Sequence, residues 1–211
     1  MSADQIALAP WADTDRRERA REAKREAVLL AAVRLFNARG YHATALDDVA
    51  TALGVTKPTI YHYFANKDEI LFECLRRGLD GVALAARQAS AQGGSAAVRL
   101  RAVLTAYGVL ITDDFGMCVA RTQDHHLAAD SRARFRALKR EIDGILRSVI
   151  AEGQQDGSLA VGDTRIAAFT AASALNGLGQ WFNPEGPLAR EDAARATTDV
   201  LMGGMIARKG A

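Results

Sequence analysis

Apolar residues recur every three or four positions along most of the chain, which is the spacing of helices with one buried face. The first such stretch starts at Asp15 with charges of alternating sign and becomes amphipathic at Leu29, Val33 and Phe36. Gly40 follows directly after an arginine, which is typical of a helix end. We therefore predict a first helix that begins at Asp15 and ends at Gly40.

The following stretch predicts a short second helix. Thr44 and Asp47 have the form of an N-terminal capping box, with aspartate where glutamate or glutamine is usual. Apolar residues then recur at helical spacing, namely Leu46, Val49, Ala50 and Leu53. Gly54 interrupts this pattern, and glycine tolerates the positive φ that a tight turn requires.

A third helix follows the turn. Thr56 can cap it, and Pro58 falls within its first turn, where a missing amide hydrogen costs little. The helix continues through Ile60, Tyr61 and Phe64. Two short helices around one glycine, with the small Ala50 where they touch, indicate a helix-turn-helix. The helix that begins at Lys57 is then the one offered to the major groove of DNA.

The rest of the chain predicts a larger helical body. Asn66 caps a helix with an acidic first turn, which runs from Lys67 to about Ser90 before the sequence QGGS breaks it. Further helices are predicted at residues 96–112, 117–129, 131–155, 163–182 and 188–208. We expect a disordered tail over residues 1–14, a helix-turn-helix domain over 15–66 and a helical domain over 67–211.

Composition supports an all-α fold. The 211 residues include only 4 prolines and 6% aromatic residues, so helix-forming residues dominate and strand signals are scarce. The net charge is +2. Residues 1–78 hold twelve lysines and arginines against eleven aspartates and glutamates, so bulk charge gives nucleic-acid binding little support. Any attraction to DNA must come from the placement of particular cations.

Cysteine usage and hydropathy indicate a soluble, cytoplasmic protein. Cys74 and Cys118 lie far apart and fit neither a disulfide framework nor a metal-ligand spacing. We expect Cys118 to be a buried small apolar residue, not a redox sensor, because no basic residue beside it would lower its pKa. The sequence has no secretion signal and no apolar run near the length of about 18 residues that a membrane helix needs. No membrane association is expected.

The stretch GYHATALDDVATALGVTKPTIYHYFANKDEIL closely resembles the DNA-binding segment of TetR/AcrR-family transcriptional regulators. The matching pattern consists of Gly40-Tyr41 before the second helix, Gly54-Val55 at the turn, and Tyr61-His62-Tyr63-Phe64 followed by Lys67. The resemblance implies a homodimeric, ligand-responsive regulator, usually a repressor, with an all-helical C-terminal domain. It implies release from a pseudo-palindromic operator by a small molecule.

The resemblance also implies which residues contact DNA. Thr44, Tyr61, His62 and Lys67 would contact phosphates, and Lys57, Thr59 and Tyr63 would approach bases or sugars, with Thr56 on the same exposed side. Alternatively, one tyrosine packs at a domain interface and Lys57 is an ordinary solvated residue. Four arginines in the first helix could extend the DNA contact or simply form a solvated helix face: Arg16, Arg17, Arg19 and Arg21.

The C-terminal body offers two faces for dimerisation. Residues 163–182 carry small and aliphatic side chains that permit close helix approach, and residues 131–155 offer an apolar face: Phe135, Leu138, Ile142, Ile145, Leu146 and Val149. In the family the corresponding helix pair forms a four-helix bundle across a two-fold axis. We expect a homodimer through residues 131–155 and 163–182, although packing within one chain could consume either face.

An effector pocket is less clear from the sequence. Candidate lining residues combine apolar bulk with a few polar groups: Leu104, Tyr107, Phe115, Met117, His125, Phe169, Asn176 and Trp181. For each of them the alternative is a place in the core. The segment around Trp181 is similar to C-terminal helices of TetR-type regulators of lipid or steroid catabolism, which suggests acyl-CoA or another hydrophobic compound. Gln180 before Trp181 departs from the family's basic-aromatic arrangement.

Other functions find little support. The chain has no nucleophile elbow, phosphate loop, dinucleotide fingerprint or zinc-protease helix, so we expect neither an enzyme nor a cofactor. His125 and His126 beside Asp124 suggest a metal site, but adjacent histidines point to different sides of a helix, so a polar surface or pocket donor is favoured over a metal. A protein-interaction module that merely shares the helical fold stays open. A purely architectural DNA-binding protein would not need the second domain.

Overall fold

The computed structural model describes the backbone of residues 11–207 and the side chains from residue 16 onward. The described residues form α-helices joined by short loops, with a single 3-10 helix, η1. The helices are α1 (Trp11–Arg39), α2 (Leu46–Leu53), α3 (Lys57–Tyr61), α4 (Lys67–Ser90), α5 (Ala96–Ile111), α6 (Asp114–Arg121), η1 (Asp124–His126), α7 (Ala129–Gln155), α8 (Thr164–Trp181) and α9 (Arg190–Gly203). The predicted all-α fold is confirmed.

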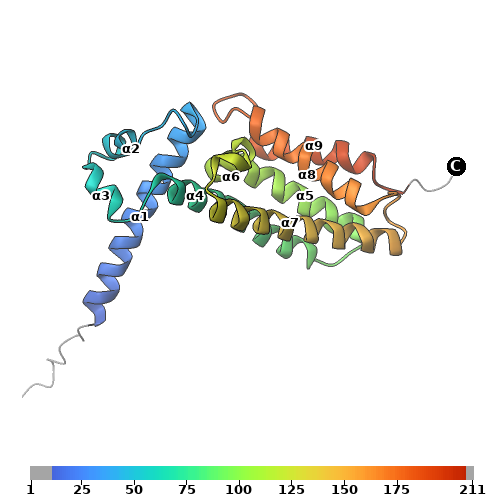
Figure 1. Ribbon diagram of the computed structural model, residues 1–211. Helices are drawn as coiled ribbons and strands as arrows, with labels where there is room; N and C mark the ends of the chain where they lie inside the picture. Colours follow the sequence, from blue (N-terminus) through green and yellow to red (C-terminus); the bar gives the residue numbers. More distant parts are fainter. Residues whose placement is uncertain (1–10, 208–211) are drawn as a thin grey trace, which may run out of the picture.

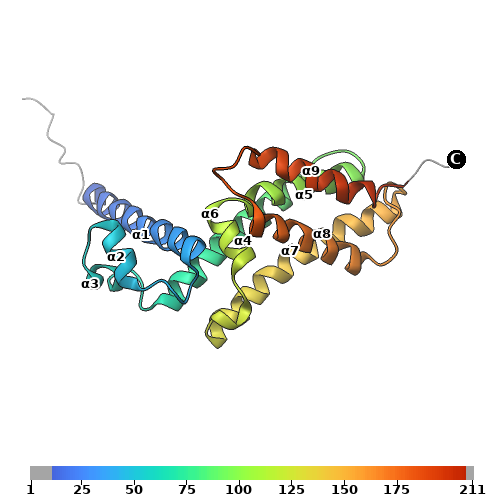
Figure 2. The same ribbon diagram turned by 90° about the horizontal axis from the view of Figure 1, so that it is seen from above.

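The first three helices form a small domain at one end of an elongated molecule (Figure 1). The C-terminal half of α1 packs against α2, α4 and α6. The core of this small domain is a set of fully or almost fully buried apolar side chains: Val28, Leu29, Val33, Phe36, Val49, Ile60 and Phe64. The N-terminal part of α1 projects beyond this domain, away from the rest of the molecule (Figure 1), and Figure 2 shows α2 and α3 on one side of α1.

The remaining helices form the body. Helix α4 links the two parts and packs along α5, α6 and α7, and α5 packs along α9. Two glycines permit close helix crossings. A Cβ on Gly78 of α4 would lie 2.8 Å from the Phe115 carbonyl oxygen of α6, and one on Gly116 would overlap the Leu110 carbonyl oxygen. Helices α4, α5 and α6 therefore lie too close together at this junction to accommodate any larger side chain at these two positions.

Several helix boundaries differ from those predicted. Helix α1 begins at Trp11, so residues 11–14 are helical where a tail was expected, and residues 1–10 lie outside the described part. Helix α3 ends at Tyr61, before Phe64. The helix expected over residues 117–129 is α6, which begins at Asp114 because the Asp113 carboxylate accepts a hydrogen bond from the Gly116 amide at 2.7 Å. It ends at Arg121, and η1 follows.

Within residues 11–207 no single helix is long and apolar enough to cross a membrane. Helices α5 and α6 reach that length and composition only when taken together, across a bend of 92°.

Candidate DNA-binding and effector sites

The turn between α2 and α3 is built by Gly54. This residue has a φ of 65°, in the left-handed region that favours glycine, and ends α2. The amide of Val55 donates to the Ala50 carbonyl at 3.0 Å, which closes the turn. Thr56 then takes the extended conformation of an N-cap, and Pro58 occupies the first turn of α3. The two helices are thus oriented by local signals, as the sequence predicts.

The side of α3 that faces away from the core carries most of the predicted DNA contacts. Thr56, Lys57, Tyr61 and His62 are exposed, and Tyr61 has 49% of its surface accessible. Thr59 is half-buried, and its hydroxyl lies 3.0 Å from that of Thr56. Tyr63 is also half-buried and packs on the core, which agrees with the alternative that one of the two tyrosines is structural.

Lys57 and Lys67 lie in different environments. Lys57 Nζ donates to the Asp47 carboxylate of α2 at 2.9 Å, and this hydrogen bond and the nearby charge raise the pKa of Lys57. Lys67 is half-buried, with Nζ 4.2 Å from the centroid of the Tyr41 ring. Partial burial lowers the pKa of Lys67 despite the nearby Asp48. Each lysine must leave its partner or share it in order to contact a phosphate.

Thr44 is not placed as predicted. It is 1% exposed, and its hydroxyl donates to the Gly40 carbonyl at 2.9 Å. The N-cap of α2 is Ala45, one residue later, and the Asp48 carboxylate accepts from the Ala45 amide at 2.7 Å. The predicted box of Thr44 and Asp47 is therefore wrong. Because the Thr44 side chain closes the loop after α1 from inside, the phosphate contact predicted for it is wrong too.

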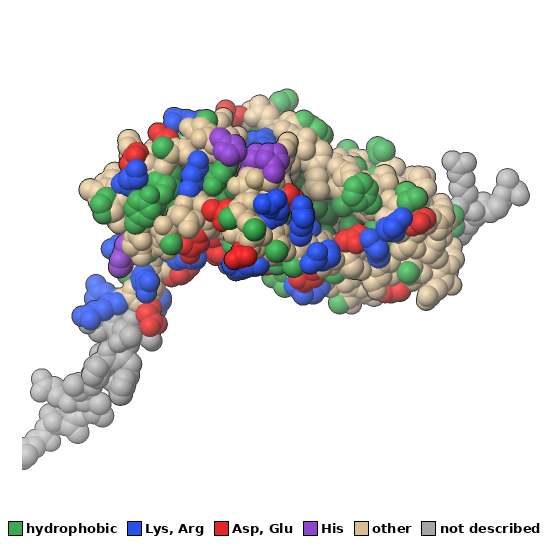
Figure 3. Space-filling view, viewed as in Figure 1, with side chains coloured by type: hydrophobic (Ala, Val, Ile, Leu, Met, Phe, Trp, Pro, Cys, Tyr) green, Lys and Arg blue, Asp and Glu red, His purple; other side chains and the backbone are tan. Residues whose placement is uncertain are grey.

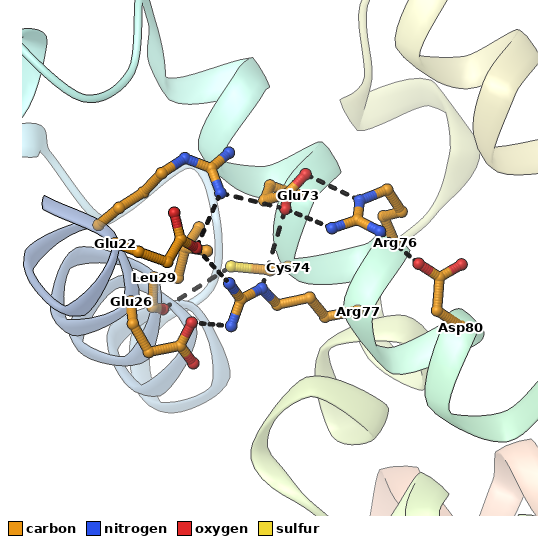
Figure 4. A network of polar contacts seen from close by, with 9 residues as sticks. Glu22, Glu26, Leu29, Glu73, Cys74, Arg76, Arg77 and Asp80 are labelled. Atoms are coloured by element: carbon orange, nitrogen blue, oxygen red, sulfur yellow. Dashed lines mark hydrogen bonds and ion pairs between the residues drawn. The ribbon is translucent and has the colours of Figure 1, made fainter. Parts of the chain in front are cut away.

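An ion-pair network joins α1 to α4 (Figure 4). Glu73 of α4 is 8% exposed and accepts from Arg76 at 2.6 Å and from Arg25 of α1 at 3.4 Å. The hydrogen bond from Arg76, together with the charges of Arg76 and Arg25, holds the pKa of Glu73 below its usual value against the effect of burial. Arg77 reaches back to Glu26 and Glu22 of α1. These contacts fix α1 of the helix-turn-helix domain to α4, so a movement of α4 would carry the domain with it.

The body contains a cleft of about 420 Å³ between α7 and α8, with α4, α5 and α6 contributing to its walls. Its residues include Leu79, Tyr107, Val119, Ile142, Phe169 and Asn176. Tyr107 is almost fully buried, and its hydroxyl donates to Asn176 Oδ1 at 3.0 Å. Burial raises the pKa of Tyr107 to about 12, so the phenol stays neutral. A second hollow of about 400 Å³ shares Val119, Lys139, Ser173 and Asn176 with the first.

Cations gather along the α7 side of this cleft. They recur at helical spacing as Arg136, Lys139, Arg140 and Arg147, with Asp143 the one acid among the cleft residues. Arg136 and Lys139 pair with Asp124 at 2.6 and 2.5 Å. Arg147 pairs with Asp143 at 2.7 Å through a terminal nitrogen, and its enclosed Nε has no hydrogen-bond partner in the described part of the chain. The sequence prediction missed these residues, although their spacing on one face of α7 was a usable signal.

The eight predicted effector residues are only partly brought together. Tyr107, Phe169 and Asn176 line the cleft. Met117 and Trp181 line a more open hollow of about 600 Å³ beside the end of α1. Leu104 is fully buried in the core, and Phe115 is half-buried, 5.8 Å from the Arg77 guanidinium. His125 is exposed near the junction of the two domains. These five residues do not line the cleft.

Histidines gather at that junction (Figure 3). The ring of His126 lies 4.7 Å from that of His42 and 4.5 Å from that of His125. Burial and the two neighbouring imidazoles lower the pKa of His126. Among the described residues no group of three histidines, cysteines or acids is placed to hold a metal ion. Cys118 is buried as expected, and burial raises the pKa of its thiol to about 12.

An exposed helix after a glycine turn, set on a body with a cleft, defines a helix-turn-helix DNA-binding protein with a separate helical domain. Comparison of sequences specifies the family. The models for "Bacterial regulatory proteins, tetR family" and "Tetracyclin repressor-like, C-terminal domain" match residues 28–74 and 93–205. The chain therefore belongs to the TetR family of transcriptional regulators, and it is not an enzyme.

Individual relatives span most of the chain. The HTH-type transcriptional activator FasR of Mycolicibacterium smegmatis is 29% identical over 191 residues, 88% of this chain and 84% of its own. The HTH-type transcriptional repressor KstR2 of Rhodococcus jostii is 27% identical, covering 86% and 91%. The crystal structure of AibR in complex with isovaleryl coenzyme A and operator DNA is similar with a TM-score of 0.75, at 26% identity and covering 84% and 97%.

Proposed function

We propose that the protein is a homodimeric repressor that reads a pseudo-palindromic operator through α3 and releases it when a small molecule binds the cleft. The exposed face of α3 carries this proposal. Lys57 and Thr59 are suited to base contacts, and Tyr61, His62 and Lys67 to phosphates. Such a protein would act in the cytoplasm, where operator DNA is accessible.

Selection of oligonucleotides from a random pool tests the DNA-binding half of the proposal. A dimeric regulator should enrich one sequence with two half-sites separated by about one helical turn, or a multiple of it. Enrichment of no sequence would contradict operator binding. It would favour the alternative of a protein-interaction module.

The effector would be an anionic amphiphile such as an acyl-CoA. The cleft combines apolar walls with four cations, and the relative AibR is described in complex with isovaleryl coenzyme A. The cations suit phosphates of a CoA headgroup, and the apolar interior suits an acyl chain. Tyr107 and Asn176 add a buried polar pair that can bind a carbonyl or hydroxyl oxygen of the ligand.

Thermal unfolding with acyl-CoAs, free acids, steroids and CoA alone would identify the effector class. Binding at about 100 times Kd stabilises a folded protein by about 2.7 kcal/mol, which is readily seen as a rise in Tm. We expect acyl-CoAs to raise Tm more than the acid or CoA alone, and Arg140→Gln to reduce that rise. Arg101→Gln is the matched control, because Arg101 is a partly exposed arginine of α5 that pairs with Asp199 of α9, outside the cleft. Equal shifts in both variants would place the ligand elsewhere.

The dimer would form mainly through α8. Ile166 and Trp181 are each 62% exposed and flank an outward strip of small and polar residues: Thr170, Ser173 and Gly177. The predicted use of α7 is wrong in one respect, because four of its six apolar face residues are buried within the chain: Phe135, Ile142, Leu146 and Val149. They pack on neighbouring helices of the same subunit, with α4 the main one. Residues 163–182 would keep their predicted role, and the exposed Val200 would add α9 to the surface.

Coupling between cleft and operator would run through α4, α6 and α7. Asp68, next to Lys67, accepts from the Ala128 amide at 2.8 Å and the Ser131 hydroxyl at 2.6 Å, which ties the start of α7 to the DNA-binding end of α4. Arg34 and Asn37 of α1 bind Asp114 of α6 at 3.0 and 2.7 Å. A ligand that binds better to the conformation with wrongly spaced α3 helices would release DNA. By linkage, operator DNA must then weaken effector binding by the same factor.

A further inference from the structure

We propose that the projecting part of α1, residues 16–24, is a second DNA-binding element that contacts phosphates flanking the half-site read by α3. This inference rests on the proposed operator binding. It adds a DNA contact outside the helix-turn-helix. The partner would be duplex DNA, bound to a helix surface that no other part of the described chain covers.

The position of this segment follows from where α1 leaves the core. The Arg25 guanidinium lies 4.7 Å from the centroid of the Phe64 ring, so α1 passes the segment between α3 and α4 at residue 25. Every side chain from residue 16 to residue 24 is exposed. At about 1.5 Å per residue, this segment extends about 14 Å past the domain. That length corresponds to about four base pairs at 3.4 Å each. Figure 1 shows the helix projecting clear of α2 and α3.

The charges of this segment are sorted by face. With about 100° between successive residues, one sector of about 140° holds the cations Arg16, Arg17, Arg21 and Lys24. The acids Glu18, Glu22 and Glu26 fall on the opposite side of the helix, together with the fifth cation, Arg19. The structure uses that acidic side within the protein, because Glu22 and Glu26 both pair with Arg77 of α4. The cationic side is consequently turned away from α4 and from the body.

This arrangement explains why a nearly neutral domain can still attract DNA. Residues 16–24 contain five cations and the two acids Glu18 and Glu22, so their net charge is +3. Of the two acids, Glu22 already faces Arg77 at 3.6 Å. Because residues 16–24 have no buried face, packing against a core does not stabilise this part of the helix. A row of cations on one side of it is complementary in charge to the phosphate backbone of a duplex. Figure 3 shows Lys and Arg side chains gathered at this end of the molecule.

Two duplexes carrying the selected operator test the proposal. One ends at the outer edges of the half-sites, and the other extends by about ten base pairs, one helical turn, on each side. The variant is Arg16→Gln, Arg21→Gln and Lys24→Gln together, since glutamine keeps helix propensity while removing charge. Glu18→Gln is the matched control, because it changes charge in the same segment on the acidic face. Circular dichroism verifies that both variants stay helical.

We expect the wild-type protein to bind the extended duplex more tightly than the trimmed one. The triple variant should bind the two duplexes with equal affinity, namely the affinity of the wild-type protein for the trimmed duplex. On the extended duplex, the slope of log K against log salt should fall by about 0.9 for each phosphate that the variant no longer neutralises. Glu18→Gln should bind at least as well as wild type. The proposal is wrong if the wild-type protein binds both duplexes with equal affinity, or if the triple variant has wild-type affinity for both. It is also wrong if the triple substitution lowers the affinity for both duplexes equally. Failure of wild type to bind either duplex would instead contradict operator binding itself.

Discussion

At the scale of single residues, the two lysines of the DNA-binding surface differ in what holds them. Lys57 is anchored to Asp47 of the preceding helix, at the N-terminal end of α3 where base edges would lie. Lys67 rests on the Tyr41 ring at the start of α4, outside the recognition helix. One lysine is thus suited to reading bases and the other to positioning the domain on the backbone.

These positions predict different effects of substitution. Lys67→Ala should weaken binding to all sequences alike and lower the salt slope by about 1, because a phosphate contact carries no sequence information. Lys57→Ala and Thr59→Ala should also relax sequence preference, by about 1–3 kcal/mol at the base concerned. Titrations of the selected operator and single-base variants at several salt concentrations measure both effects. Unchanged affinity in all three proteins would remove this surface from the DNA interface.

At the scale of helices, the attachment of α1 to α4 depends on a carboxylate in a poorly solvated place. Glu73 has only 11% of its side chain exposed and is shared by Arg25 and Arg76. Removing its charge would leave Arg76 only Asp80 and Arg25 only Glu22, two more exposed acids, which is costlier than breaking an exposed ion pair. The network therefore contributes to stability and to the transmission of movement from α4 to the helix-turn-helix.

Glu73→Gln should lower the free energy of unfolding by about 2 kcal/mol near neutral pH, less than for a fully buried pair because the arginines are partly solvated. Since the folded-state pKa of Glu73 lies below its unfolded value, its contribution is complete above a pH of about 4.5 and is lost as the pH falls through the folded-state pKa. Urea unfolding at several pH values should show wild type and variant converging in acid.

Asp192→Asn is the control for this experiment. It breaks an exposed pair with Arg195 on α9 and should change stability by less than about 0.5 kcal/mol. A destabilisation by Glu73→Gln no larger than in this control would mean that the network is not stabilising.

At the scale of the whole molecule, the proposed effector cleft and the proposed dimer surface share α8. Phe169 lines the cleft and is 71% exposed, one turn from Ile166 on the outer face. A ligand that moves α8 would therefore alter both its own pocket and the angle between subunits. This common helix is a physical route by which the cleft can change the spacing of the two α3 helices.

Ile166→Glu should dissociate the dimer without unfolding the subunit, because a charge is introduced at a site that is exposed in the monomer. Affinity for the palindromic operator should fall, since two linked half-sites bind far more tightly than one. Light scattering at micromolar concentration measures the oligomeric state. Val98→Glu, at a similarly exposed residue of α5, is the control and should stay dimeric. A monomeric wild type, or a dimeric Ile166→Glu, would contradict an interface through α8.

Local sequence signals determined the helix-turn-helix of this protein. Gly54 can adopt a positive φ, Pro58 fits a first turn and Asn66 caps α4, and each effect acts within a few residues. The all-α fold and the order of helices follow from such signals together with apolar spacing. The family resemblance rested on the same short stretch.

Tertiary structure decided which faces those helices could use. Thr44 became an internal hydrogen-bond donor because the loop after α1 folds over it, and the apolar face of α7 was buried, mainly against α4. The cationic cleft likewise arises only where α7 meets α8. Apolar spacing shows that a helix buries one side, but not whether its own chain or a second molecule covers that side, because this choice depends on contacts between residues far apart in the sequence.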